Sequence, residues 1–243
     1  MVVSAFGSPV DVAAWDQFST QTRIPVLIDG AASFDSVASS AINRPGRTPI
    51  MVSLHATKVF GVGEGGFVIC SDRDFITRFT RICNFGVLMT PEGQILGYNG
   101  KESEYHAAVG LSNLDGWPER RARMADLTER YRIRLGNRAD ISLVPGYGEG
   151  WISCYCNIRV KQEAAGVIEH LRLRGVETRR WWQLGVHHQR AYRDFTRDPL
   201  PHTEELAPAV FGLPFFHDIT DSQIDLVVDA LFEALDTIPV TSK

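Results

Sequence analysis

The chain has 243 residues and a formal net charge of −4, with 44% hydrophobic and 22% charged residues. This composition is typical of a globular protein, and the length allows one large or two ordinary domains. The charge gives no reason to expect nucleic acid as a partner, and no apolar run reaches the ~18 residues of a membrane helix. We therefore expect small-molecule partners, with no nucleic acid and no membrane.

Cysteines occur at positions 70, 83, 154 and 156, without CxxC pairs and without the histidine spacing of zinc sites. We expect buried free thiols, no disulfide framework and no metal. The first residues lack the charged segment and long apolar core of a signal peptide. These features together predict a cytoplasmic protein.

The first predicted elements have the order strand, helix, strand. Residues 2–6 are predicted as a strand, a helix capped near Ser8 or Asp11 follows, and residues 24–29 form an apolar strand that ends at Asp29. This order, with uninterrupted apolar strands, favours a parallel sheet covered on both faces. Ligands of such sheets bind at the carboxyl ends of the strands, so Asp29 is a candidate site residue.

Lys58 lies in a glycine-rich turn between two predicted strands, residues 48–54 and 66–70. A lysine at a strand end beside a tight turn can be desolvated, which lowers the pKa of its amine until the amine can attack a carbonyl. An arbitrary lysine is far more often a surface residue. The chemical interpretation of Lys58 therefore depends on its neighbours.

The middle of the chain is predicted to be helical. A helix is expected over residues 71–83, a loop rich in Gly, Pro and Asn over residues 84–101, and helical structure from 103 to about 135, broken near Pro118. The loop separates the two helical parts.

The second half alternates strands and helices. Strands are predicted over residues 141–144, 151–160 and 176–182, and helices over 162–174, 204–210 and 221–235, the last capped by Asp221 or Ser222. We interpret residues 139–243 as a smaller α+β domain. Residues 1–138 then form the larger domain with its helical connector.

Four motifs in this order carry a resemblance to a known family. They are Asp29 at a strand end, the S-x-H-x-T-K run that ends at Lys58, the G-E-G-G turn that ends at Gly66, and G-x-N-x-x-x-x-E from Gly97 to Glu104. In combination they resemble the pyridoxal-phosphate-dependent sugar aminotransferases of the DegT/DnrJ/EryC1/StrS family. The closing segment, residues 212–220, is similar to that family's L-P-x-x-P-x-I-T. The resemblance spans nearly the whole chain.

The resemblance implies the PLP-dependent transferase fold type I, here an α/β partial large domain with a mainly parallel sheet plus a C-terminal α+β small domain. It implies that Lys58 forms a Schiff base with pyridoxal 5'-phosphate and moves the proton between substrate and cofactor. Asp29 would pair with the pyridinium nitrogen and keep it protonated. Ser53 would bind the cofactor phosphate. Asn99 would reach the phosphate of a second copy, which implies a homodimer with shared sites.

Two departures from the family pattern are visible. Many members have glutamine near the cofactor ring oxygen where this chain has Ser33, whose shorter side chain would contact the ring differently or through a water. Full-length members also begin well before the position of Met1, with a helix N-terminus that binds the phosphate and an aromatic residue that stacks on the ring. We therefore expect weak cofactor binding by this chain alone, and a need for a complementing N-terminal segment or partner.

The implied function is transfer of an amino group, from glutamate, to a keto group of a nucleotide-linked deoxysugar. Family members that are dehydratases carry histidine in place of the lysine, so Lys58 argues against that activity. A non-catalytic or degenerate member that serves as a dimerising or partner-binding protein is the alternative. A cofactor-free α/β protein that binds a small molecule is a third hypothesis.

Structural interpretations exist beside the functional ones. Asp29 could be a helix cap and Asn99 a turn residue, and Ser53 could be a small core residue. His55 is interpreted as a packed neighbour of the lysine loop. His187 and His188 are adjacent, and adjacent side chains point apart in regular structure, so a loop facing the sugar pocket or solvent is favoured over a metal pair.

Overall fold

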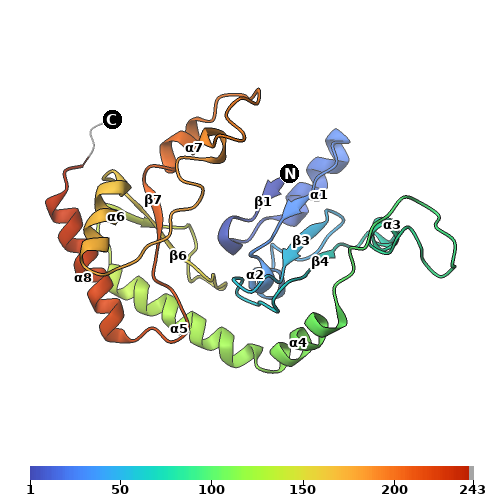
Figure 1. Ribbon diagram of the computed structural model, residues 1–243, viewed down its shortest axis with the longest axis horizontal. Coiled ribbons are helices and arrows are strands. Elements are labelled where there is room, and N and C mark those ends of the chain that lie inside the picture. The colour runs from blue at the N-terminus through green and yellow to red at the C-terminus, as the bar shows by residue number, and fades with distance from the viewer. Residues whose placement is uncertain (241–243) are drawn as a thin grey trace. The chain divides into compact units, whose positions relative to one another are not determined.

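The computed structural model describes residues 1–240, which form two compact units (Figure 1). Unit 1 comprises Met1–Ala125 together with Glu149–Cys154, and unit 2 comprises Asp126–Gly148 together with Tyr155–Lys243. The last part of the predicted helical connector, from Asp126, therefore belongs to unit 2. The division at 138/139 stays a prediction.

Unit 1 is built on a four-stranded sheet with the order β1-β2-β3-β4. Strands β1 (Val2–Val3), β2 (Ile28–Asp29) and β3 (Ile50–Ser53) are parallel, and β4 (Gly66–Ile69) runs antiparallel to β3. The mainly parallel sheet predicted from the sequence is thus confirmed. The buried apolar cluster at this sheet consists of Ile28, Ile50 and Val52 together with Val12 from the helix that follows β1.

The first two strands are shorter than predicted. Phe6 has a φ of 54° and lies in a short 3-10 helix, η1 (Ala5–Gly7), a conformation that ends the strand. Within the predicted strand 24–29, Ile24 is 54% exposed, and only the last two residues pair with both neighbouring strands. The predictions of full strands over 2–6 and 24–29 are therefore wrong in length.

Two helices of unit 1 begin at the residues that their capping signals in the sequence indicate. The side chain of Asp11 accepts a hydrogen bond from the Ala14 N–H at 3.0 Å, and Asp72 caps its helix through the Phe75 N–H at 3.0 Å. The predicted break near Pro118 is also confirmed. The helices are α1 (Val12–Thr22), α2 (Phe34–Ser39), α3 (Arg73–Cys83), α4 (Glu104–Asp115) and α5 (Trp117–Leu135), the last of which continues into unit 2.

Unit 2 is an antiparallel sheet with helices. Strands β5 (Ile141–Leu143), β6 (Cys156–Val160) and β7 (Val210–Leu213) pair in that order. The helices are α6 (Ala164–Leu173), α7 (Pro201–Leu206) and α8 (Asp221–Thr237), with a 3-10 turn, η2 (Val186–His188). The core of the unit includes Leu127, Tyr131, Ile158, Leu171, Phe211 and Leu231.

Several predictions for the second half are corrected. Residues 176–182 form no strand but only an isolated bridge, Arg179 to Gly212. The predicted helix 204–210 lies earlier, in α7, and its last residue belongs to β7. Thr220, not Asp221 or Ser222, caps α8, because its side chain and that of Gln223 bond each other's backbone N–H.

The described cysteines are free thiols, as predicted, but only Cys156 is buried, and the expected burial is wrong for the half-buried Cys70, Cys83 and Cys154. Burial raises the pKa of Cys156 to about 12, which keeps its sulfur protonated. No helix within residues 1–240 combines the length and apolarity needed to cross a membrane.

Candidate functional site

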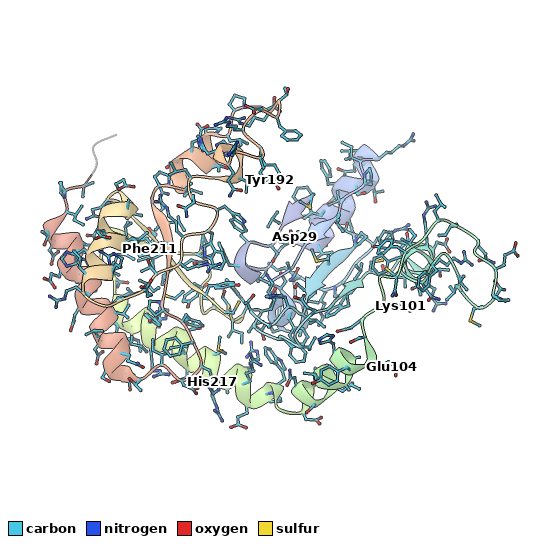
Figure 2. The ribbon with its side chains drawn as sticks, in the orientation of Figure 1. Asp29, Lys101, Glu104, Tyr192, Phe211 and His217 are labelled. Carbon is cyan, nitrogen blue, oxygen red and sulfur yellow. The ribbon has the colours of Figure 1, made fainter. Side chains whose placement is uncertain are left out.

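Asp29 and Ser53 end two neighbouring parallel strands, so they lie at the same edge of the sheet. Asp29 is the last residue of β2 and pairs with Met51, two residues before Ser53, which ends β3. Asp29 is half-buried (Figure 2), and its Oδ1 accepts a hydrogen bond from the Ala31 N–H at 3.0 Å. The other carboxylate oxygen has no hydrogen bond to another described residue, so it can bind a cationic N–H.

Lys58 lies in the tight loop between β3 and β4. The loop is closed by backbone hydrogen bonds, from the Leu54 N–H to the Gly65 carbonyl at 2.9 Å and from the Ala56 N–H to the Gly63 carbonyl at 2.8 Å. Lys58 is half-buried, and its Nζ forms no hydrogen bond or ion pair with any described residue. Among the described residues, nothing therefore competes with a ligand for this amine.

The backbone beside Lys58 is anchored by an aromatic cluster. Phe60 is 3% exposed and stacks on Phe34 of α2, with ring centroids 4.1 Å apart and planes 10° apart. Trp117, the first residue of α5, meets the Phe60 ring edge-on at 5.6 Å. Aromatic ring pairs prefer particular orientations, so the cluster holds the backbone at Phe60, two residues after Lys58, in one position.

Replacing Phe60 by leucine is expected to loosen this anchor. The side chain stays apolar but loses its ring contacts, so the free energy of unfolding should fall by about 1 kcal/mol. Denaturant unfolding measures this change, and the rate at which Lys58 reacts with pyridoxal phosphate should fall in parallel. Phe195→Leu, at a residue 69% exposed, serves as the control and should change neither quantity. Equal effects of the two variants would contradict the anchoring role.

Ser53 and His55 are connected through the loop backbone. The Ser53 hydroxyl accepts a hydrogen bond from the His55 N–H at 3.2 Å, which leaves the hydroxyl proton available for an anion. The His55 ring lies 2.9 Å from the Thr57 hydroxyl and 3.6 Å from Glu64. These local contacts support the interpretation of His55 as a packed neighbour of the lysine loop.

The hydroxyl of Ser33 is engaged elsewhere. Ser33 is fully buried and donates to the Ser4 hydroxyl at 2.5 Å, and Ser4 in turn donates to the Ser8 carbonyl at 2.5 Å. A contact between Ser33 and a cofactor ring stays a prediction. To contact a cofactor ring, the Ser33 hydroxyl would have to share or give up its hydrogen bond to Ser4.

Asn99 lies in the segment between α3 and α4. The residue is exposed, and its Oδ1 accepts a hydrogen bond from Lys101 Nζ at 3.1 Å. None of its contacts with described residues involves Asp29, Ser53 or Lys58. Its predicted role at the site of a second copy stays a prediction.

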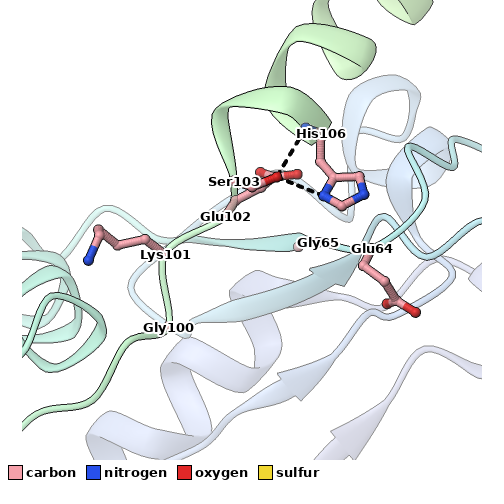
Figure 3. A pocket seen from close by; sticks show the side chains of 8 residues that line it. Glu64, Gly65, Gly100, Lys101, Glu102, Ser103 and His106 are labelled. Atoms are coloured by element: carbon pink, nitrogen blue, oxygen red, sulfur yellow. Dashed lines mark hydrogen bonds between the residues drawn. The ribbon is translucent and has the colours of Figure 1, made fainter.

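A pocket of about 390 Å³ adjoins the turn that follows the lysine loop (Figure 3). Gly65 has a φ of +152°, and a Cβ there would lie 2.2 Å from the Glu102 carboxylate, so the close approach requires glycine. Ser103 caps α4, and its hydroxyl lies 2.8 Å from His106 Nδ1. The pocket is lined by Glu64, Gly65, Gly66, Gly100, Lys101, Glu102, Ser103 and His106.

Sequence reasoning did not single out Glu102 or His106. The only signal for them is the glycine-rich turn itself, since glycines without side chains leave room for another segment to approach. The ends of β2 and β3 carry the Asp29 carboxylate and the Ser53 hydroxyl, and the loop after β3 carries the Lys58 amine, which has no partner among the described residues. This set can hold a carbonyl compound, a protonated ring nitrogen and an anion.

Comparisons with known proteins identify the family of this chain. The model of the DegT/DnrJ/EryC1/StrS aminotransferase family matches residues 1–232. Protein Rv3402c of Mycobacterium tuberculosis is 28% identical over 244 residues, which cover 96% of this chain and 57% of that protein. The dTDP-4-amino-4,6-dideoxy-D-glucose transaminase of Shigella dysenteriae is 27% identical, with coverages of 96% and 65%.

Among solved structures, DesI in the presence of its TDP-sugar product is 28% identical with a TM-score of 0.80. The match covers 96% of this chain and 61% of DesI. The likeness confirms the predicted fold type I. The chain spans 57% to 65% of the length of these relatives.

Proposed function

The chain belongs to the DegT/DnrJ/EryC1/StrS aminotransferase family, and we propose that it acts as the catalytic part of a sugar aminotransferase that uses pyridoxal 5'-phosphate. The observation that carries the proposal is the half-buried Lys58 amine without a partner among the described residues. It follows the strand that ends at Ser53, and Asp29 ends the neighbouring strand.

These residues fit the cofactor. Lys58 Nζ would hold its aldehyde carbon, the Asp29 carboxylate would hold the proton on its ring nitrogen, and the Ser53 hydroxyl would donate to its phosphate. When bound, the cofactor supplies an electron sink for the bond that breaks at the substrate carbon. Lys58 Nζ would carry the proton between the substrate carbon and the cofactor, from the amino donor in one half of the transfer and to the acceptor sugar in the other.

We further propose a nucleotide-linked keto deoxysugar as the acceptor and glutamate as the donor. A nucleotide sugar is supported by the dTDP-linked sugar in the name of the Shigella dysenteriae transaminase and by the TDP-sugar product of DesI. The proposal includes a cytoplasmic homodimer in which Asn99 serves the site of the second copy. The proposal also includes a complementing N-terminal segment or partner that completes the binding site for the cofactor phosphate.

The experiment is an amino-transfer assay of Asp29→Asn against the unchanged chain. Both are supplied with pyridoxal phosphate, glutamate and a dTDP-4-keto-6-deoxysugar, with 2-oxoglutarate measured by mass spectrometry. Asparagine cannot hold the ring nitrogen protonated, so the rate should fall by about 10²- to 10³-fold, as for loss of one preorganised electrostatic contact. Each assay is run with and without the part of the Shigella dysenteriae transaminase that this chain does not match.

Asp11→Asn provides the matched control, because Asp11 only caps α1 and asparagine caps equally well. Its rate should equal that of the unchanged chain. A rate for Asp29→Asn within twofold of this control would contradict the proposed role of Asp29. Absence of 2-oxoglutarate in every complemented assay would contradict the activity itself.

A further inference from the structure

Two adjacent histidines and a glutamate converge in unit 2. The 3-10 turn η2 places the His187 and His188 rings with centroids 4.2 Å apart, although side chains of neighbouring residues point apart in regular structure. Glu204 comes from α7. One ligand atom from each of these residues lies within 4.8 Å of those of the other two.

His187 has a buried ring nitrogen that faces this cluster. The residue is 8% exposed, and its Nε2 has no hydrogen-bond partner among the described residues. The nearest carboxylate oxygen, Glu204 Oε1, is 3.8 Å away, beyond hydrogen-bond distance. A buried polar atom without a partner is costly, so something is expected to occupy the space between the two atoms.

The backbone is shaped to hold the ring in this place. Gly185 has a φ of +115°, and a Cβ there would lie 2.6 Å from His187 Cε1 and 2.7 Å from Nδ1. Only glycine permits so close an approach. Among the described residues, the Glu204 carboxylate has no ion pair closer than its 3.8 Å approach to His187, whereas its neighbour Glu205 pairs with Arg159 at 2.8 Å.

We propose that His187, His188 and Glu204 bind one divalent transition-metal ion of the zinc class. Two imidazole nitrogens and a carboxylate oxygen form a donor set that zinc accepts, with water as the fourth ligand. The ligand atoms of a tetrahedral ion with bonds of about 2.0–2.2 Å lie about 3.4 Å apart. The distances between the three ligand atoms, which are at most 4.8 Å, therefore need to shorten by no more than about 1.4 Å when the ion binds. The ion would fasten the segment that precedes α7 to that helix.

A cobalt titration of the whole chain tests the proposal, since Co²⁺ takes zinc sites and absorbs visible light when coordinated. The expected result is one Co²⁺ per chain, displaced by Zn²⁺. His188→Gln and Glu204→Gln, both at exposed side chains, should each raise the Kd at least tenfold. His202→Gln removes a histidine of α7 that lies outside the cluster, so this variant should bind Co²⁺ with the same Kd as the unchanged chain.

Two outcomes would overturn the proposal. One is binding by Glu204→Gln with an unchanged Kd, and the other is a sulfur-to-cobalt absorption band, which would assign the ion to cysteines. Circular dichroism checks that each variant is folded. Zn²⁺ should raise the melting temperature of the unchanged chain and of His202→Gln, but not that of Glu204→Gln. None of these readouts requires amino transfer.

Discussion

Replacing Lys58 by alanine is expected to abolish amino transfer. The lysine is proposed both to hold the cofactor covalently and to move the proton at the reacting carbon. The loss should therefore exceed the about 10²- to 10⁴-fold attributed to a single general acid or base. The complemented assay with glutamate and a nucleotide-linked keto sugar measures this rate.

Covalent labelling separates the two roles of the lysine. The chain has four lysines, at 58, 101, 161 and 243, so borohydride reduction after addition of pyridoxal phosphate gives an adduct that peptide mass spectrometry can assign. The adduct should lie on Lys58 and disappear in Lys58→Ala. Lys161→Ala, at an exposed residue of unit 2, should retain both adduct and rate.

Two results would count against this view. Unchanged activity of Lys58→Ala in the complemented assay would favour a dimerising or partner-binding role over catalysis. Strong labelling with turnover by the isolated chain would contradict the expectation that a complementing segment is needed.

Replacing Asp35 by alanine is expected to cause the largest loss of stability. Asp35 is 1% exposed and accepts hydrogen bonds from Arg121 Nε at 2.6 Å and Nη2 at 3.2 Å. Its Oδ2 also accepts from the Ile152 N–H at 2.9 Å and from the Ser39 hydroxyl at 3.3 Å. Removing Asp35 leaves the buried Ile152 N–H without its acceptor and the Arg121 guanidinium, whose side chain is 35% exposed, without its carboxylate, which together should cost about 3 kcal/mol.

Urea unfolding measures the effect of Asp35→Ala as a lower midpoint at unchanged slope. Asp194→Ala is the control, because the Asp194 side chain is 89% exposed and such substitutions change stability by about 0.5 kcal/mol or less. A loss below about 1 kcal/mol for Asp35→Ala would contradict this expectation. It would show that the attraction between Asp35 and Arg121 is offset by the cost of removing the charges from water.

The parts of the fold that follow from neighbouring residues were predictable. Asp11 and Asp72 are capping residues whose partners lie three positions on, so helix starts could be predicted from sequence. The loop of Lys58 could be located because apolar strands and glycines flank it on both sides. The family motifs then added a proposed role for Asp29, which periodicity alone places only at a strand end.

The parts that depend on distant residues were not predictable. Residues 151–155 alternate like a strand, yet Ile152 bonds Asp35 and Ser153 bonds the Phe6 carbonyl at 2.9 Å, more than a hundred positions away. No local pattern reports such partners. The same holds for the bond of Ser33 to Ser4 and for the approach of Glu204 to His187.

The segment Glu149–Cys154 belongs to unit 1 although Asp126–Gly148, which precedes it, belongs to unit 2. During synthesis the ribosome must therefore add β5 of unit 2 before the last piece of unit 1 exists. Until then Asp35 lacks the Ile152 N–H, so unit 1 reaches its full set of hydrogen bonds only after unit 2 has begun to emerge. The order of the chain thus makes the completion of unit 1 depend on the synthesis of part of unit 2.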